Sequence, residues 1–251
     1  MHPKLAPGLH VLRRGDGRLQ VGLDRSLAVV LPDTEPVRRD LDRLVAGNLA
    51  EAPAQLKPLL RRPEPGLKAR LAVVGFGHPA GQRLVPRLKD LAASYGLGPG
   101  RGAAQVAVLV GAGEPCRTTT DEWTRRGTPH LVVRLVEGHA LVGPFVDPGR
   151  TACLRCTDAA TTDEDPSWPL LLEQYIGHSA RDRPDGAGEP VDPALADLAC
   201  AWALRDVVSY LQDRRPTSWS ATVRLDPWLH DLRTTSWLRH PACGCTWTMA
   251  L

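Results

Sequence analysis

One stretch decides the fold class: Arg70-Leu71-Ala72-Val73-Val74-Gly75-Phe76-Gly77-His78-Pro79-Ala80-Gly81. Its apolar first half is typical of a buried strand, and its glycines form a tight turn that leads into a helical pattern through Leu84, Leu88 and Leu91. Strand, glycine turn and helix open a Rossmann-type unit. Two further strands, at residues 106–110 and 131–136, follow with a helical stretch around Trp123 between them. This alternation predicts an α/β fold with a parallel, doubly wound sheet.

The same turn is a weak candidate for nucleotide binding. Its G-x-G-x-x-A pattern leaves backbone amides for a phosphate, but Pro79 has no amide hydrogen to donate. No Asp or Glu closes the strand at residues 106–110, where a partner for a ribose is expected. We therefore interpret the turn as a means of packing the helix on the sheet and assign no cofactor-binding residue there.

Four cysteines fall in two tight pairs, Cys153 with Cys156 and Cys243 with Cys245. Brought together, the pairs would supply the four thiolate ligands that tetrahedral Zn²⁺ prefers, with no position left for substrate. The alternatives are two disulfides or four unrelated core cysteines. Disulfides rarely persist in a reducing cytosol, and such short gaps would close strained rings. The pattern therefore predicts a structural zinc site.

The remaining residue signals are weaker. His240 precedes Cys243 by three residues and is a reserve ligand, although such a histidine more often packs beside a metal loop. Cys200 lies in a helical apolar pattern and is expected in the core. Cys116, beside Pro115, is only a faint candidate nucleophile and the histidines are scattered, so we assign no catalytic residue.

Composition limits the cellular context. Residues 1–30 contain no apolar stretch of the signal-peptide type, and no window approaches the roughly 20 apolar residues of a membrane span. We therefore expect a cytoplasmic chain without a membrane partner. The 31 Lys and Arg residues are interspersed with 28 Asp and Glu residues, and the net charge is +3. The absence of a basic tract argues against a nucleic-acid partner.

The chain length and a stretch of proline and glycine predict two domains, residues 1–66 and 67–251. The chain has 251 residues, and the prolines and glycine at residues 61–66 are typical of a linker. Before the linker, three short strands within residues 8–31 are joined by an Asp16-Gly17 turn and by a second turn at residues 24–26. A helix capped by Asp33 or Thr34 follows, and a second helical stretch holds Leu56 and Leu59.

Residues after the first cysteine pair alternate between irregular and regular patterns. The stretch 161–190 is expected to be rich in loops, with a short helix at residues 168–172. Asp192 then caps a long apolar helix, and two strands lead through Trp219 and Trp237 toward Cys243.

Three motifs now carry a resemblance to a known family. They are Val142-Gly143-Pro144, then Pro148-Gly149-Arg150-Thr151-Ala152-Cys153-Leu154-Arg155-Cys156, and finally His240-Pro241-Ala242-Cys243-Gly244-Cys245. Over roughly residues 67–251 the chain resembles the ThiF-like partner proteins of azole-forming YcaO cyclodehydratases, which belong to pathways for thiazole- and oxazole-modified peptides such as bacteriocins. The resemblance implies a Rossmann-type domain like that of ubiquitin-activating enzymes, zinc-holding cysteine pairs, and ATP-using chemistry in a separate or fused YcaO component.

Residues 1–66 resemble the small winged-helix-like domain by which those proteins hold the leader of a ribosomal precursor peptide. The resemblance implies that the leader adds as a strand to the exposed edge of the small sheet. The residues that this implies are Leu27, Ala28, Val29, Val30 and Leu31 on the edge, with Leu56 and Leu59 near the side-chain pockets. The family's domain usually carries three helices, whereas this stretch has room for about two. An alternative is that the second domain covers the edge.

Three hypotheses of function follow. The first is a non-catalytic recognition subunit that binds a precursor leader and presents the peptide to a YcaO cyclodehydratase for azoline formation; whether the chain is itself an enzyme stays open. The second is an ATP-dependent adenylating enzyme of the ThiF or MoeB type. The third is a zinc-stabilised interaction scaffold with an unrelated partner. The sequence leaves the oligomeric state open, with a homodimer among the options.

Overall fold

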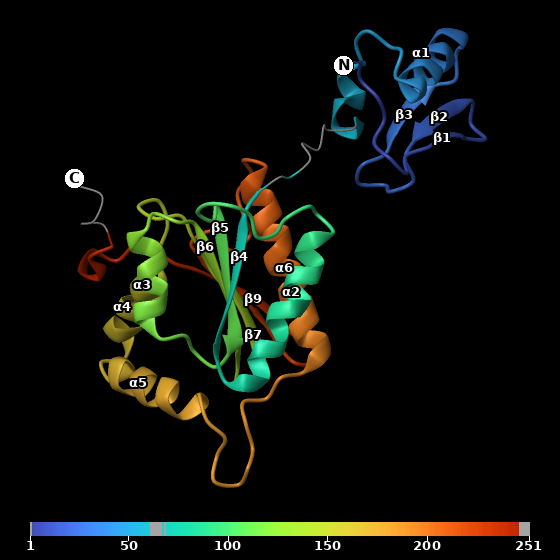
Figure 1. The fold of residues 1–251 in the computed structure, drawn as a ribbon. Coiled ribbons are helices and arrows are strands. Elements are labelled where there is room, and N and C mark those ends of the chain that lie inside the picture. The colour runs from blue at the N-terminus through green and yellow to red at the C-terminus, as the bar shows by residue number, and fades with distance from the viewer. Residues whose placement is uncertain (1, 61–66, 68, 246–251) are drawn as a thin grey trace. The chain divides into compact units, whose positions relative to one another are not determined.

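The protein consists of two compact units, Met1–Pro65 and Gly66–Leu251. The computed structural model describes residues 2–60, 67 and 69–245, and the predicted linker at residues 61–66 lies outside them. Each unit contains its own cluster of buried apolar side chains. Figure 1 draws the helices and strands of both units.

The Met1–Pro65 unit is built on a three-stranded antiparallel sheet. Its strands are β1 (Val11–Arg13), β2 (Arg18–Val21) and β3 (Val29–Pro32), in that order across the sheet. The first two strands meet at the predicted turn, where Gly17 has a φ of 72° that suits glycine. The pairing confirms the predicted three-stranded meander.

The third strand begins two residues later than predicted. The carbonyl oxygen of Asp24 accepts the backbone N–H groups of Leu27 and Ala28 at 3.1 and 2.7 Å. The Asp24 carboxylate also accepts the N–H of Ser26 at 2.9 Å, which closes a tight turn. Because this turn uses both amides, the prediction that Leu27 and Ala28 belong to the edge strand is wrong.

Two helical segments pack on one face of this small sheet. Helix α1 (Glu35–Ala46) begins after Thr34, as predicted, and ends at Gly47 with a φ of 77°. The second segment, η1 (Ala54–Leu59), is a 3₁₀ helix that contains Pro58. The core between helices and sheet is formed mainly by leucine, at Leu19, Leu31, Leu41, Leu44, Leu56 and Leu59, together with Val21.

The Gly66–Leu251 unit is built on a six-stranded sheet. Its strands follow chain order across the sheet: β4 (Leu71–Gly77), β5 (Val106–Ala112), β6 (His130–Val136), β7 (His139–Val146), β8 (Ala221–Leu225) and β9 (Leu232–Ser236). The first three strands are parallel, as predicted, whereas β7, β8 and β9 are antiparallel to their neighbours. The expectation of a wholly parallel sheet is therefore wrong.

The change of direction has a local cause. Only Glu137 and Gly138 separate β6 from β7, and both have positive φ, 51° and 78°. A two-residue turn of this kind joins antiparallel strands, because a parallel connection needs a dozen residues or more. The sequence prediction placed the strand at residues 131–136 correctly but did not include this hairpin.

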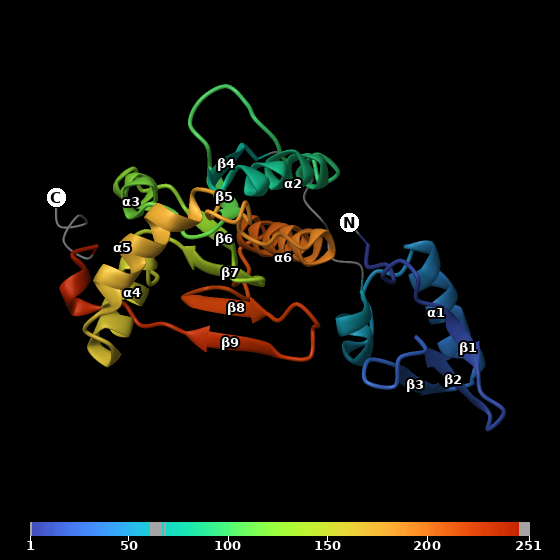
Figure 2. The same cartoon turned by 90° about the horizontal axis from the view of Figure 1, so that it is seen from below.

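Helices cover both faces of the large sheet (Figure 2). Side chains at alternate positions of β5 pack in opposite directions: Val106, Val108 and Val110 belong to one core cluster, and Ala107 and Leu109 to another. The helices of the first face are α2 (Leu84–Ala93) and α6 (Pro193–Leu211); those of the second are α3 (Arg117–Arg125) and α4 (Leu154–Glu164). Within the described part of the chain, no helix combines the length and apolarity that a membrane crossing requires.

The segment predicted as rich in loops is partly helical. Helix α5 spans Trp168–Ser179, far beyond the short helix expected at residues 168–172. Its apolar residues Leu170 and Leu171 are 61% and 50% exposed, and Leu172 is buried. Because the helix buries so narrow a stripe, its sequence carries little of the periodicity that identifies a helix.

The glycine turn after β4 packs directly on β5. A Cβ atom at Gly77 would lie 2.0 Å from the carbonyl oxygen of Ala112, and one at Gly81 would lie 2.2 Å from the Ala112 nitrogen. The turn and the short helix η2 (Pro79–Arg83) thus approach the end of β5 with no space for a side chain. This agrees with the interpretation of the glycines as packing residues.

We predict that Gly81→Ala lowers the free energy of unfolding by about 2 kcal/mol, because the added methyl group overlaps backbone atoms that cannot move independently. Chemical denaturation of the full chain measures the effect. Gly177→Ala is the control, since a Cβ there meets nothing within 4 Å and alanine favours the helix. Equal stability of the two variants would contradict the packing argument.

Candidate metal centre and peptide-binding edge

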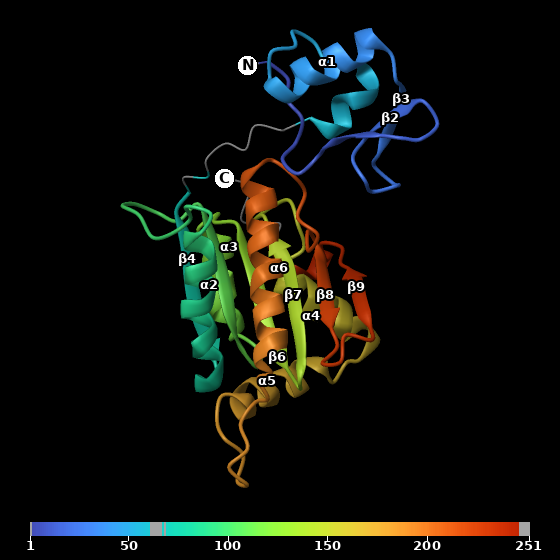
Figure 3. The same cartoon turned by 90° about the vertical axis from the view of Figure 1, so that its right-hand side faces the viewer.

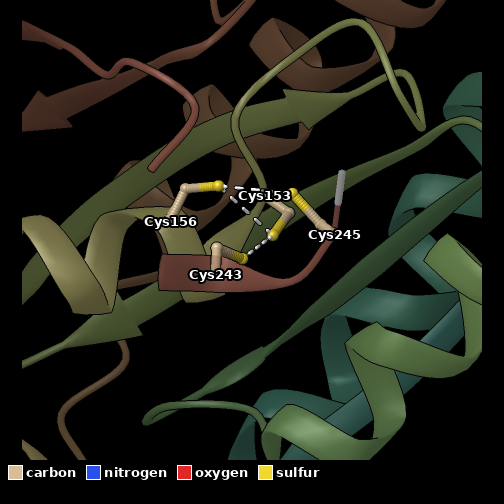
Figure 4. Close-up of side chains that lie close together, drawn as sticks. All are labelled: Cys153, Cys156, Cys243 and Cys245. Atoms are coloured by element: carbon tan, nitrogen blue, oxygen red, sulfur yellow. Dashed lines mark hydrogen bonds between the residues drawn. The ribbon is translucent and has the colours of Figure 1, made fainter. Parts of the chain in front are cut away.

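The two cysteine pairs are carried by two different elements. Cys153 is the N-cap residue of α4 and Cys156 lies in its first turn. Cys243 ends the short helix η3 (Pro241–Cys243), and Gly244 has a φ of 71°, which turns the chain before Cys245. Figure 4 shows the four side chains gathered with their sulfur atoms toward one another.

The sulfur positions fit a tetrahedral metal ion. The Sγ atoms are separated by 3.8 Å between Cys153 and Cys156, 3.4 Å between Cys153 and Cys243, and 3.5 Å between Cys156 and Cys245. All four lie within 4.8 Å of one another. A metal–sulfur bond of about 2.3 Å places tetrahedral sulfurs about 3.8 Å apart, whereas a disulfide needs about 2.05 Å. The four cysteines are free thiols in an arrangement that could bind one metal ion.

Electrostatics oppose simultaneous ionisation of the four thiols. Hydrogen bonding from Cys153 lowers the pKa of Cys156, whereas hydrogen bonding to Cys156 and burial raise the pKa of Cys153. Burial, together with the neighbouring thiols, raises the pKa of Cys245 to about 12. A first thiolate therefore opposes ionisation of the others. A divalent ion among the sulfurs would remove this repulsion, and the start of helix α4 also favours negative charge.

His240 is not part of the cluster. Its Nδ1 atom accepts the N–H of Ala242 at 3.2 Å, and its Nε2 atom lies 2.9 Å from the carboxylate of Asp163 on α4. With Nδ1 as acceptor, Nε2 carries the proton and donates to Asp163. Both ring nitrogens are thus engaged, and His240 instead ties the start of η3 to α4.

The glycine turn is closed by protein groups. The Nδ1 atom of His78 accepts the N–H of Ala80 at 3.1 Å, and its Nε2 atom lies 2.8 Å from a carboxylate oxygen of Asp182. His78 is itself buried, and a Cβ at Gly188 would lie 2.6 Å from its ring. The backbone amide of Ala80 is therefore already engaged within the protein.

A buried ionic network near the cluster was not predicted. Arg117 contacts both carboxylate oxygens of Asp158 at 2.7 and 2.9 Å and Glu114 at 2.9 Å, and Arg134 contacts Glu114 at 2.6 Å. Burial alone would lower the pKa of Arg117, but the two carboxylates raise it. The network links α3, α4 and β6. Its members share no sequence motif, so nothing in the sequence identifies them as partners.

The free edge of the small sheet presents one residue that can both donate and accept. The N–H of Arg14 donates to the carbonyl of Arg18, and the N–H of Gly22 donates to the carbonyl of His10. The backbone N–H and C=O groups of even-numbered residues of β2 therefore point toward β1. Its odd-numbered residues face β3, where Leu19 is opposite Leu31 and Val21 opposite Val29. The backbone of Val30 therefore points away from the sheet. No other strand pairs with this side of β3 among the described residues.

A small cavity of about 50 Å³ lies beside this edge. It is lined by residues of β3, α1 and the start of η1: Leu31, Val37, Asp40, Leu41, Pro53, Gln55 and Leu56. Val30 is 40% exposed, whereas Leu31, Leu56 and Leu59 are at most 5% exposed and belong to the core of this unit. Of the predicted peptide-binding set, the structure places Leu31 and Leu56 in the lining of this cavity, adds residues of α1 to it, and leaves Val30 and Leu59 outside the lining.

Comparison with known proteins identifies a shared fold. The heterocyclase TruD aligns at a TM-score of 0.70 and 15% identity, over 98% of this chain and 42% of its own. A heterocyclase in complex with substrate and cofactor gives 0.71 and 13%, over 98% and 39%. The Microcin C7 biosynthetic enzyme MccB in complex with N-formylated MccA gives 0.62 and 13%, over 98% and 100%.

The chain spans about two-fifths of the length of the two heterocyclases. These neighbours are consistent with the resemblance to ThiF-like partners of cyclodehydratases, and at such identities the likeness is one of fold. No family model matches the sequence, and no curated protein does.

We predict one thiolate-bound metal ion per chain, lost when Cys243 and Cys245 are both replaced by serine, because half of the ligands disappear. Elemental analysis of the purified protein measures it. Cys116→Ser is the matched control, since Cys116 is exposed and lies outside the cluster. Full metal content in the double variant would refute the site.

Proposed function

We propose that the chain binds the leader of a ribosomal precursor peptide and presents the peptide to a YcaO-type cyclodehydratase for azoline formation. The fold it shares with a heterocyclase and with a Microcin C7 biosynthetic enzyme supports involvement in peptide-natural-product biosynthesis. In this proposal the Met1–Pro65 unit recognises the leader and the Gly66–Leu251 unit is a non-catalytic scaffold.

The observation that carries the proposal is the edge of β3 beside the small cavity. An added antiparallel strand would exchange two hydrogen bonds with Val30, one through its N–H and one through its carbonyl. The N–H of Ala28 is engaged by Asp24, Pro32 has no N–H, and the Pro32 carbonyl already accepts the N–H of Thr34 at 3.0 Å, so neither residue offers a donor. The edge therefore fixes the register of the peptide around Val30, and Leu31 and Leu56 offer apolar contacts in the groove.

We propose that the cysteine cluster holds structural Zn²⁺. Four thiolates complete a tetrahedral zinc shell and leave no open position, so the ion would supply folding energy and no reaction chemistry. Its ligands, Cys153, Cys156, Cys243 and Cys245, would anchor the C-terminal segment on α4. The identity of the metal rests on the soft donor set, which zinc binds in preference to magnesium or calcium.

The adenylating alternative is less well supported. A solved structure of E. coli MccB, a protein of the same fold, contains ATP. In the present chain, however, the His78 ring takes the amide of Ala80, and the glycines of the turn lie against Ala112. A phosphate would have to displace both of these contacts.

We predict that Val30→Pro weakens leader binding at least tenfold, about 1.4 kcal/mol, because proline removes the donor at the centre of the edge. Fluorescence anisotropy with a labelled leader peptide measures the affinity. Val11→Pro is the control: it places the same substitution at an outward-facing position of β1, on the opposite edge. If both variants bind the leader as the unaltered chain does, the peptide is held elsewhere.

We also predict no ATP turnover by the isolated chain. The assay is exchange of radiolabelled pyrophosphate into ATP, with and without a precursor peptide. Precursor-dependent exchange would favour the adenylating alternative and would contradict the scaffold role of the Gly66–Leu251 unit.

A further inference from the structure

A cavity of about 810 Å³ lies in the Gly66–Leu251 unit, and none of its lining residues belongs to the cysteine cluster or to the glycine turn. Its lining residues come from the end of α6, the loop after it, the residue before β5 and the loop after β7: Gln105, Arg150, Tyr210, Leu211, Asp213, Arg214, Arg215 and Trp219. The end of α6 lies at the end of the sheet where β4 and β5 begin (Figure 3), opposite the glycine turn. We infer that this cavity binds an acidic peptide segment of a partner protein.

The charges in the cavity are unbalanced. Three guanidinium groups line it, from Arg150, Arg214 and Arg215, against the single carboxylate of Asp213. Arg150 is already paired with Asp147 at 2.9 Å. The side chains of Arg214 and Arg215 form no ion pair with any described residue. Two exposed arginines thus remain available for carboxylates, which guanidinium groups bind in a bidentate manner.

The loop that carries Arg214 and Arg215 is held in place by hydrogen bonds to Asp206 of helix α6. The buried carboxylate of Asp206 accepts the N–H and the hydroxyl of Thr217 at 2.8 Å each, and the N–H of Ser218 at 2.9 Å. Its second oxygen also accepts the Ser218 hydroxyl. Phe145 in turn donates its N–H to the Ser218 carbonyl at 2.8 Å. A wall fixed in advance loses less conformational entropy when it binds a partner.

The aromatic floor favours a peptide over a nucleotide. The rings of Phe145, Tyr210 and Trp219 pack on one another with centroids 4.8 to 6.3 Å apart. The guanidinium of Arg150 lies 5.4 Å from the centroid of Trp219, over its ring. The Arg150 guanidinium and the neighbouring rings already cover the indole of Trp219, so Trp219 offers no free face on which a base could stack. Base stacking is a main contact of nucleic-acid sites.

The residue types are those of a protein-interaction surface. Tryptophan, tyrosine and arginine are the side chains most enriched at the energetic centres of interfaces. All the lining residues belong to the Gly66–Leu251 unit, so the inference does not depend on leader binding by the other unit.

The test uses the full chain and a fluorescein-labelled peptide of alternating glutamate and glycine in an anisotropy titration. We expect saturable binding that weakens as NaCl is raised, and no binding of the same peptide with glutamine in place of glutamate. Arg214→Glu combined with Arg215→Glu should weaken binding at least tenfold. Arg214→Lys with Arg215→Lys should weaken it less, because charge is kept and bidentate geometry is lost.

The matched control is Arg83→Glu combined with Arg125→Glu. Both residues are exposed, lie in the same unit outside the cavity, and give an equal change of net charge. Thermal unfolding and metal content report whether each variant is folded. Equal loss of binding in the control, no saturable binding below 1 mM (about −4.1 kcal/mol), or tighter binding of a single-stranded oligonucleotide of matched charge would each overturn the inference.

Discussion

The four thiols join the C-terminal segment to helix α4, beyond the pairing of β9 with β8. All five residues of β9 are exposed, and Leu238 is 88% exposed. Apolar burial therefore contributes little after β8, apart from Trp237, which packs beside the cysteines. Direct bonds between sulfur and a metal ion would replace the missing hydrophobic contacts, as they do in other small metal-stabilised segments. His240 adds one hydrogen bond to Asp163 of helix α4.

The cysteine cluster can position the C-terminal segment only if helix α4, which carries Cys153 and Cys156, is itself held in place. The ionic network achieves this, since Asp158 of α4 is held by Arg117, which also contacts Glu114 beside the sheet. Buried ion pairs add little net stability when complete, but removal of one partner typically costs 3–5 kcal/mol, on the order of a third of a domain's stability. The network therefore fixes the position of α4 more than it raises the free energy of unfolding. The cysteine cluster and the ionic network thus both involve residues of α4.

The sequence predicted those features whose cause is local. The strand and turn at residues 70–81, the Asp16-Gly17 turn and the cysteine pairs each follow from neighbouring residues, and the structure contains all three. The mixed sheet could not be predicted from strand and helix alternation, because one two-residue turn at Glu137 reverses the direction. Asp24 shortened β3 through hydrogen bonds that compete with strand pairing. The ionic network and the cavity at Trp219 join residues far apart in the chain, which no local pattern reports.

The order in which the thiols are synthesised has a consequence for the cell. The first pair leaves the ribosome with α4, whereas Cys243 and Cys245 come roughly 90 residues later, a delay of about 5 to 20 seconds at ordinary translation rates. During that interval the nascent chain carries a two-thiol half-site that can lose its sulfurs to oxidation or capture a competing soft metal. A chain that binds the proposed metal ion would therefore complete its site only after Cys245 has been synthesised, and intact thiols in the first pair would be a condition for that step.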